Sequence, residues 1–587
     1  MTKELVQTED LKSVKCLHPK PCQHCRGSVT EMASFDTVEG FLVKEMGGKK
    51  VPGFSVAIVK GSEIAWAKGF GYSNQEENIP ATPETVYRVA SVSKPVIATG
   101  LLQWYDKGRF SLDDPVNKLT TNVKIQTSFK EQPTVRNLLT HTSGLPVHVD
   151  PTCFDLSQTV PLEEMIRKSA IVVRPPNQEI VYANTAFNMI GYLVGLFAGE
   201  PYPNYMKKNA FDPLEMHSSA FEQTPEIRKK MATPYARKKT DEPVQAVKPW
   251  YGGSIPEKPC GSLFSTVIDL SHFLIAQINK GVYNRRRILK ESTIMEMHKL
   301  QARAGASRSG YALAWKRTWH YGNLMLSHTG GNLGWTAHAA LYPELRVGIV
   351  ILCNLNDNSA WRPPAEEALC ILTGGKLAFD PTSIRQEAIP EEWNNLVGTY
   401  TRELRNVHIK IENGNLILER GAEKAYLERL DENRYLVHAG ASDGMELTFE
   451  FDQKNMAKQF DLETEVFPRL VEGKRPIDES TDLIGNWHGN FVHSYGYFTI
   501  DLRIEGKERA STTDMVGNIE YLSDFKADRG RVTGVFRSKI PPEYVGWGAE
   551  EFEAKLDLAA IEGRLEGRIS FKSDIGESTV PLILSRA

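Results

Sequence analysis

The sequence predicts an α+β region followed by two small all-β barrels. Its 587 residues exceed the roughly 250–300 at which a single hydrophobic core stops growing, so we expect more than one domain. Helical and strand patterns alternate from about residue 31 to residue 380. Past residue 378 the helical periods fade, and short alternating strands separated by turn residues take over. Together these observations favour an α+β unit with an all-β tail.

The α+β region opens with strands and continues with helices. From Phe54, the segment FSVAIVKGSEIAWAKGFG holds two alternating apolar runs around Lys60 and Gly61, a pattern typical of a β-hairpin. The segment KPVIATGLLQWYDKG, which follows Ser91, has apolar residues at helical spacing and ends at Gly108, so it predicts an amphipathic helix. Further helices are expected in NMIGYLVGLFA and VIDLSHFLIAQI, and further strands in HAALYPE and RVGIVILCNL.

The all-β tail contains one motif twice. LVGTY begins at Leu396 and LIGNW begins at Leu483, which suggests two copies of one β-module. In the first copy, Asn413 and Gly414 stand between alternating apolar residues and predict a hairpin turn. We therefore predict an N-terminal extension over residues 1–30, the α+β domain over 31–380, and β-barrels over 388–478 and 479–587.

Composition argues against two classes of partner. Lys and Arg number 70 against 73 Asp and Glu, and the basic residues form no long run that could follow a phosphate backbone. We therefore expect no nucleic-acid partner. No apolar stretch reaches the roughly 18–20 residues that a membrane span needs, so we expect no membrane partner either. Whether the chain forms a homo-oligomer is left open by the sequence.

The N-terminal segment combines thiols and imidazoles. It mixes acids and bases and lacks the apolar core of a secretory signal, so we expect a cytoplasmic protein. Cys16, Cys22 and Cys25 are interleaved with His18 and His24, and ligands of these types hold zinc in many proteins. Structural zinc sites usually show two spaced pairs, whereas only one is present here. We therefore favour free thiols in a disordered tail and predict no cofactor.

Ser91 and Lys94 are the first candidate pair for chemistry. They lie three residues apart at the opening of a predicted helix, so their side chains fall on one helical face. A serine hydroxyl becomes nucleophilic when a base takes its proton, and a lysine can do so when it is desolvated. The helix N-terminus adds partial positive charge beneath a developing oxyanion. Because S-x-x-K also occurs by chance, a solvated lysine in an ordinary helix turn is the alternative.

Two further motifs have modest value alone. In VYANTAFN, Tyr182 and Asn184 alternate in an extended stretch before a helix, and the phenol could relay a proton to a leaving group. The alternative is a buried tyrosine with a helix-capping asparagine. In LSHTGGNLGW, a strand ends in His328, Thr329, Gly330 and Gly331, and its two glycines would let a substrate backbone approach closely.

In this order the three motifs resemble those of the serine β-lactamase and penicillin-binding protein superfamily, in which S-x-x-K, Y-x-N and K-T-G line one cleft. The chain is most similar to the class C β-lactamase-like branch, which includes D-aminopeptidases and esterases. The resemblance covers about Phe35 to Leu377 and includes LLTHTSGLP, DPLEMHSS and PCGSLFSTVIDLSHFL. It implies an antiparallel sheet flanked by helices, with a helical subdomain.

The resemblance also implies roles for single residues. Ser91 would be the acylated nucleophile, Lys94 its base and Tyr182 the proton shuttle, while Asn184 would orient Lys94 and the substrate amide. The backbone N–H groups of Ser91 and Gly331 would form the oxyanion hole, with Gly330 beside them.

His328 departs from the family pattern, which has a lysine at this place. An imidazole is mostly neutral at pH 7, so it would attract the carboxylate of a β-lactam only weakly. A histidine here is similar to what D-aminopeptidases and some esterases of the branch show. Those D-aminopeptidases also carry two β-barrels, from which a loop reaches toward the cleft.

These observations leave three functional hypotheses. The first is an amide-bond hydrolase acting on short peptides or small amino-acid amides, with tolerance for D-residues; the second is a carboxylesterase. The third is an inactive binding protein that keeps the fold. An α/β-hydrolase is disfavoured, because the G-x-S-x-G around Ser442 precedes an alternating strand and predicts a hairpin turn. No H-E-x-x-H motif is present, and His141 in THTSG is interpreted as a packing or hydrogen-bonding residue.

Overall fold

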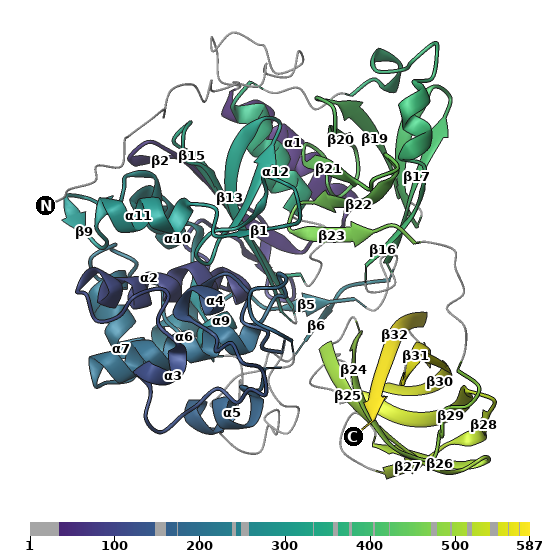
Figure 1. The fold of residues 1–587 in the computed structure, drawn as a ribbon. Coiled ribbons are helices and arrows are strands. Elements are labelled where there is room, and N and C mark those ends of the chain that lie inside the picture. Colours follow the sequence, from purple (N-terminus) through teal and green to yellow (C-terminus); the bar gives the residue numbers. More distant parts are fainter. Residues whose placement is uncertain are drawn as a thin grey trace, which may run out of the picture.

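The computed structural model shows a helix-flanked sheet followed by two β-structures (Figure 1). It describes residues 34–146, 160–172, 174–237, 242–247, 258–332, 334–355, 362–374, 379–402, 405–421, 423–470, 478–493, 496–513, 519–540, 550–561, 563–573 and 576–586. The predicted cysteine cluster at Cys16, Cys22 and Cys25 lies outside these residues.

An antiparallel sheet with the strand order β10-β11-β12-β13-β14-β15-β1-β2-β3 forms the centre of the first domain. Its strands are β1 (Gly53–Lys60), β2 (Glu63–Asn74), β3 (Ile79–Pro80), β10 (Ala302–Arg303), β11 (Gly310–Tyr311), β12 (Lys316–His320), β13 (Asn323–Asn332), β14 (Trp335–Tyr342) and β15 (Val347–Cys353). The β1–β2 hairpin and strands β14 and β15 confirm the strand predictions for these segments.

Both faces of this sheet are covered. In β1, Ala57 and Val59 belong to one hydrophobic cluster, whereas Val56 and Ile58 belong to another, as the alternation of side chains along a strand requires. Helix α10 (Val267–Ile278) contacts β1 and β15 and contributes to the first cluster, and α1 (Phe35–Gly48) and α12 (Arg362–Leu372) contribute to the second. Burial on both faces explains why the central strands are nearly continuous apolar runs.

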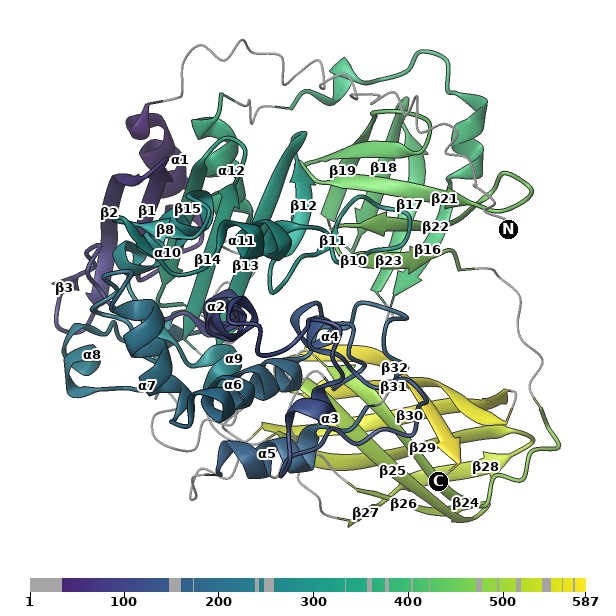
Figure 2. The ribbon, with the colours of Figure 1, turned by 60° about the vertical axis from the view of Figure 1, so that its left-hand side comes forward.

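A helical subdomain lies at one end of the sheet and surrounds helix α2 (Figure 2). Residues Ser93–Gln103 of α2 are buried along their whole length, and α2 packs against α6 and α9. The helix ends at Asp106, shortly before Gly108 at φ 69°, as predicted. The other helices of the first domain are α3 (Val116–Leu119), α4 (Val135–Leu139), α5 (Leu162–Ser169), α6 (Asn184–Ala198), α7 (Tyr202–Met206), α8 (Pro225–Lys230), α9 (Lys258–Gly261) and α11 (Glu291–His298).

Short two-stranded ladders complete this domain. They pair β4 with β7, β5 with β6, and β8 with β9. Their bounds are β4 (Tyr87–Arg88), β5 (Tyr235–Ala236), β6 (Gln245–Ala246), β7 (Phe264–Ser265), β8 (Val282–Tyr283) and β9 (Arg286–Arg287).

The tail is all-β, as predicted. The first sheet runs in sequence order through β16 (Gly398–Arg402), β17 (Arg405–Glu412), β18 (Asn415–Arg420), β19 (Glu423–Arg429), β20 (Arg434–His438), β21 (Glu446–Phe451), β22 (Ala457–Leu462) and β23 (Glu465–Pro468). It nearly closes on itself, because Leu470 N–H donates to Thr399 O at 2.7 Å. Asn413 and Gly414 form the β17–β18 turn with φ of 52° and 77°, as predicted.

The second sheet has the order β27-β26-β25-β24-β32-β31-β30-β29-β28 and its own hydrophobic cluster. Its strands are β24 (Gly485–His493), β25 (Gly496–Gly506), β26 (Arg509–Thr513), β27 (Ile519–Tyr521), β28 (Ser523–Asp528), β29 (Arg531–Ile540), β30 (Glu550–Ile561), β31 (Arg564–Ser573) and β32 (Gly576–Arg586). The predicted domain limits at residues 388, 478 and 479 stay predictions.

Polar contacts join the first tail sheet to the first domain, at the segment between β10 and β11. The Asp461 carboxylate accepts hydrogen bonds from the backbone N–H groups of Ala306 and Ser307, at 2.7 and 3.1 Å. The Glu446 carboxylate forms an ion pair with Arg308, although its side chain is only 2% exposed. Because an unpaired buried carboxylate is costly, these partners fix how the first tail sheet sits on the first domain.

Among the helices that the structure describes, none is long and apolar enough to cross a membrane.

Candidate active site

Ser91 lies in a short 3-10 turn, Ala90–Val92, that leads directly into α2 at Ser93. Ala90 has φ 46°, a left-handed conformation that is unusual for a residue with a Cβ. The turn is held by Val89, whose N–H donates to Leu263 O at 2.9 Å and whose carbonyl accepts from Val92 N–H at 3.1 Å. Backbone strain of this kind collects at functional sites, where the surrounding structure enforces it.

Lys94 follows one turn later and contacts Ser91 directly. Its Nζ lies 2.9 Å from Ser91 Oγ and donates to the Cys260 carbonyl at 3.0 Å. Lys94 is completely buried. The same Nζ lies over the rings of Tyr182 and Phe187, at 4.8 and 5.6 Å from their centroids. Ring faces and a carbonyl oxygen at these positions stabilise a positive charge on the Lys94 nitrogen.

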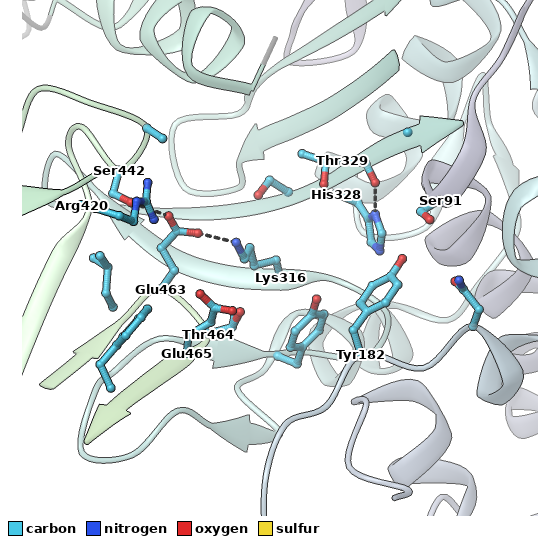
Figure 3. Close-up of a pocket in the computed structure, with 17 residues that line it drawn as sticks. Ser91, Tyr182, Lys316, His328, Thr329, Arg420, Ser442, Glu463, Thr464 and Glu465 are labelled. Carbon is cyan, nitrogen blue, oxygen red and sulfur yellow. Dashed lines mark hydrogen bonds and ion pairs between the residues drawn. The ribbon is translucent and has the colours of Figure 1, made fainter. Parts of the chain in front are cut away.

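Tyr182 and Asn184 lie at the entry to α6. Ala183 is the extended N-cap residue, with φ −136° and ψ 109°, and Asn184 is the first helical residue. Figure 3 shows the Tyr182 hydroxyl pointing between His328 and Ser91. Asn184 is buried and lines the same pocket as Tyr182. The structure thus brings the first and second sequence motifs together.

His328 is uncharged in this environment. Its Nδ1 donates to the Thr329 carbonyl at 2.7 Å, which leaves Nε2 without a proton in the neutral ring. The side chain is buried, and burial, followed by the positive charge of Lys94, lowers the pKa of His328 to about 3. Within the described residues, its Nε2 has no hydrogen-bond partner. The imidazole therefore offers the pocket an acceptor and no charge.

Gly330 lets β13 pass against the serine turn. A Cβ at Gly330 would lie 2.2 Å from the Val89 carbonyl oxygen and 3.1 Å from the Ser91 backbone nitrogen. No side chain fits there without displacing the strand. Gly331, the next residue, lines the pocket with Ser91. The predicted pair of backbone donors therefore lies on two adjoining segments, which is the arrangement an oxyanion hole requires.

These residues open into a pocket of about 520 Å³. The first domain contributes Tyr311, Lys316, Ser327 and Thr329 besides the predicted residues, and the first tail sheet contributes Arg420, Ala441, Ser442, Leu462, Glu463, Thr464, Glu465 and Phe467. One wall of the pocket therefore comes from the tail, as the resemblance to two-barrel relatives led us to expect.

Lys316 and Glu463 are pocket residues that the sequence analysis missed. Lys316 lies on β12 opposite Ser327, next to the strand position of His328, and forms an ion pair with Glu463 (Figure 3). Glu463 also accepts from Ser442 Oγ at 3.0 Å. Ser442 lies in the β20–β21 turn, as predicted. The sequence did not predict that Ser442 also lines the pocket. No local motif marks these residues, because they meet only when two sheets pack together.

The comparison with family models decides the family. The model described as Beta-lactamase matches residues 38–370, which is more than half of the chain. The chain belongs to the beta-lactamase family. The predicted resemblance and the fold class are thereby confirmed.

Two relatives illustrate the similarity of this beta-lactamase family member to known proteins. Protein flp of Staphylococcus aureus (strain COL) is 25% identical over 312 residues, which are 52% of this chain and 60% of that protein. The chain thus spans less than two thirds of the relative's length. The octameric penicillin-binding protein homologue from Pyrococcus abyssi is 24% identical with a TM-score of 0.52, covering 74% of this chain and 100% of that one. This likeness shows the fold.

The described part of this family member contains no group of three His, Cys, Asp or Glu side chains arranged to hold a metal ion. The predicted alternative of a zinc site at Cys16, Cys22 and Cys25 stays untested, since those residues lie outside the described ranges.

We predict that Gly330→Ala displaces β13 from the serine turn. The added Cβ would overlap the Val89 carbonyl, and such overpacking typically costs about 1–3 kcal/mol of stability. Labelling of Ser91 by a fluorophosphonate probe should slow by at least about tenfold, because one-ångström shifts of reacting groups have effects of this order. Gly47→Ala, in helix α1 with open space around its Cβ, is the matched control. Unchanged labelling in Gly330→Ala would refute this close-approach argument.

Proposed function

We propose that this chain is a serine hydrolase that works through an acyl-enzyme at Ser91, and that its substrates are amides of amino acids or short peptides. The observation that carries the proposal is the 2.9 Å contact between Ser91 Oγ and the buried Lys94 Nζ. A buried amine beside a serine hydroxyl is the pair that nucleophilic catalysis needs. Membership in the beta-lactamase family, whose enzymes are serine hydrolases, supports the same chemistry.

In the proposed acylation step, Lys94 Nζ takes the Ser91 hydroxyl proton while Ser91 Oγ attacks the substrate carbonyl carbon. The backbone N–H groups of Ser91 and Gly331 stabilise the oxyanion, and one such donor typically contributes about 3–4 kcal/mol. Tyr182 passes a proton to the leaving nitrogen as its bond to carbon breaks. Asn184 orients Lys94 and the substrate amide. Water then hydrolyses the acyl ester.

The charged side chains of the pocket lining are compatible with a substrate that carries an amino group. Lys316 already pairs with Glu463, and Arg420 pairs with Glu423 at 2.8 Å. His328 is neutral, because burial and the Lys94 charge lower its pKa. Glu465 adds a further carboxylate to the pocket lining. The carboxylates of Glu463 and Glu465 can accept hydrogen bonds from a substrate ammonium, which agrees with an aminopeptidase or amino-acid amidase.

Ester cleavage would follow the same acyl-enzyme route and differs mainly in what the leaving group demands. The decisive experiment therefore compares turnover of D-alanyl and L-alanyl anilides, short-chain nitrophenyl esters and a chromogenic cephalosporin. We expect measurable anilide turnover with preference for the D-isomer, and slow cephalosporin turnover. The Ser91→Ala and Lys94→Met variants should each turn over these substrates at least about a thousandfold more slowly, because catalytic groups that act as a unit have effects of this size when one is removed.

Two results would contradict the proposal in different ways. Strong ester turnover with no detectable anilide turnover would replace the amidase by an esterase. Failure of a fluorophosphonate to label Ser91 in folded protein, with no substrate consumed, would favour an inactive binding protein. Ser480→Ala, at an exposed position in the turn before β24, is the matched control for Ser91→Ala.

A second prediction concerns Glu465. If its carboxylate attracts a substrate ammonium, Glu465→Gln should lower kcat/KM for D-alanyl anilide by about five- to tenfold, since exposed to half-buried charge pairs contribute about 1 kcal/mol. The N-acetylated anilide, which has no ammonium, should be cleaved equally well by both forms. The exposed Glu479→Gln is the matched control. Equal losses for both anilides would show that Glu465 does not recognise the amine.

A further inference from the structure

His141 lies behind the tyrosine of the proposed site, and the mechanism above gives it no role. It is completely buried and has φ 59°, which is uncommon for a residue with a Cβ. It follows α4 in the segment THTSG, which runs beside residues 174–183. A buried, strained histidine next to a candidate catalytic side chain calls for a physical explanation.

His141 accepts two hydrogen bonds from the residues on either side of Tyr182 in the sequence. The His141 carbonyl accepts from Val181 N–H at 2.8 Å, and His141 Nδ1 accepts from Ala183 N–H at 3.0 Å. One histidine thus holds the peptide unit between Ile180 and Val181 and the one between Tyr182 and Ala183. The main chain of an extended segment otherwise has two free dihedral angles at each residue, so these bonds set the direction in which the phenol leaves the chain.

The imidazole also fixes the phenol ring itself. The rings of His141 and Tyr182 stack with centroids 4.3 Å apart and planes inclined by 29°. Tyr311 also contacts the imidazole edge-on, with ring centroids 4.8 Å apart, and the Phe187 ring lies at 5.2 Å. Contacts of this kind favour one relative orientation of the two rings. The imidazole is therefore held between rings and in turn limits how Tyr182 can rotate.

The hydrogen bonds determine the state of the imidazole. Because Nδ1 accepts from Ala183, the proton of the neutral ring is on Nε2, which has no hydrogen-bond partner among the described residues. Burial, followed by the positive charge of Lys94, lowers the pKa of His141 well below its usual value. A protonated Nδ1 could not accept from Ala183, so the neutral form is the one that holds the tyrosine segment.

We propose that His141 is the positioning residue that aims the Tyr182 hydroxyl for proton transfer to the leaving group. The inference rests on the proposed function, in which the proton from Ser91 reaches Lys94, passes to the Tyr182 oxygen, and the Tyr182 hydroxyl proton goes to the departing atom. His141 exchanges no proton in these steps. Its effect is to keep the Tyr182 oxygen at the place where the leaving group departs.

The test uses full-length protein and two esters with the same acyl group, a nitrophenyl ester and an ethyl ester. Nitrophenolate leaves without a proton, whereas an alkoxide needs one, so loss of a positioned acid selectively slows the ethyl ester. Each variant is compared by kcat/KM, which reports acylation. Its rate of fluorophosphonate labelling at Ser91, where the leaving fluoride needs no proton from Tyr182, shows whether the Ser91–Lys94 pair is intact.

Three variants at position 141 separate the contributions. His141→Phe keeps a ring but loses the acceptor for Ala183 N–H, and His141→Gly loses both while fitting the left-handed backbone. His141→Asn keeps an acceptor at the δ position, and asparagine tolerates this φ. We expect the Phe and Gly variants to lose about 10–100-fold more on the ethyl ester than on the nitrophenyl ester, an order typical of misplaced catalytic groups. His141→Asn should recover most of that selective loss.

The same changes at exposed His217, outside the site, should leave both esters unaffected. Equal losses on the two esters in His141→Phe and His141→Gly would assign His141 a merely structural role and overturn the inference. The inference would also be overturned if His141→Asn lost as much kcat/KM on the ethyl ester, relative to the nitrophenyl ester, as His141→Phe does. The Tyr182→Phe variant separates the proposed proton route from the role of His141. If its loss of kcat/KM is the same for the two esters, the proton route through Tyr182 is wrong. If Tyr182→Phe selectively loses kcat/KM for the ethyl ester and the His141 variants do not, the proton route stands and only the positioning role of His141 is wrong.

Discussion

A buried amine next to a serine hydroxyl is the interaction on which this site depends. Lys94 Nζ lies 2.9 Å from Ser91 Oγ only because Ser91 occupies a strained turn one helical turn before it. Strand β13 passes so close to this serine turn that only glycine fits at position 330. The fold of the first domain therefore keeps an amine, a hydroxyl and two backbone N–H groups in one place.

The chemistry of the pocket is divided between two parts of the chain. The first domain supplies the serine, lysine, tyrosine and an uncharged imidazole, and the first tail sheet supplies a wall with carboxylates. The ion pair of Lys316 with Glu463 joins the two directly at the pocket. Because Asp461 and Glu446 fasten the same sheet to the first domain through buried hydrogen bonds, the wall is placed by the interface and not by a free loop.

The sequence was informative where function depends on local spacing and uninformative where it depends on packing. The serine–lysine pair, the turn at Asn413 and the end of α2 near Gly108 follow from periodicity and turn chemistry, and the structure agrees with them. Lys316 and Glu463 are separated by 147 positions and belong to different sheets, so no pattern connects them. The hydrogen bonds that His141 accepts from the neighbours of Tyr182 could not be predicted from the sequence either. They depend on a left-handed backbone at His141, which no sequence pattern indicates.

The most direct measurement of the central claim is the mass of the protein quenched during turnover of a slow ester or amide, followed by peptide mapping. The account predicts an adduct with the mass of the substrate acyl group on the peptide that contains Ser91, and its absence in a folded Lys94→Met variant. An adduct on another peptide, or full accumulation of the Ser91 adduct without the Lys94 amine, would contradict it.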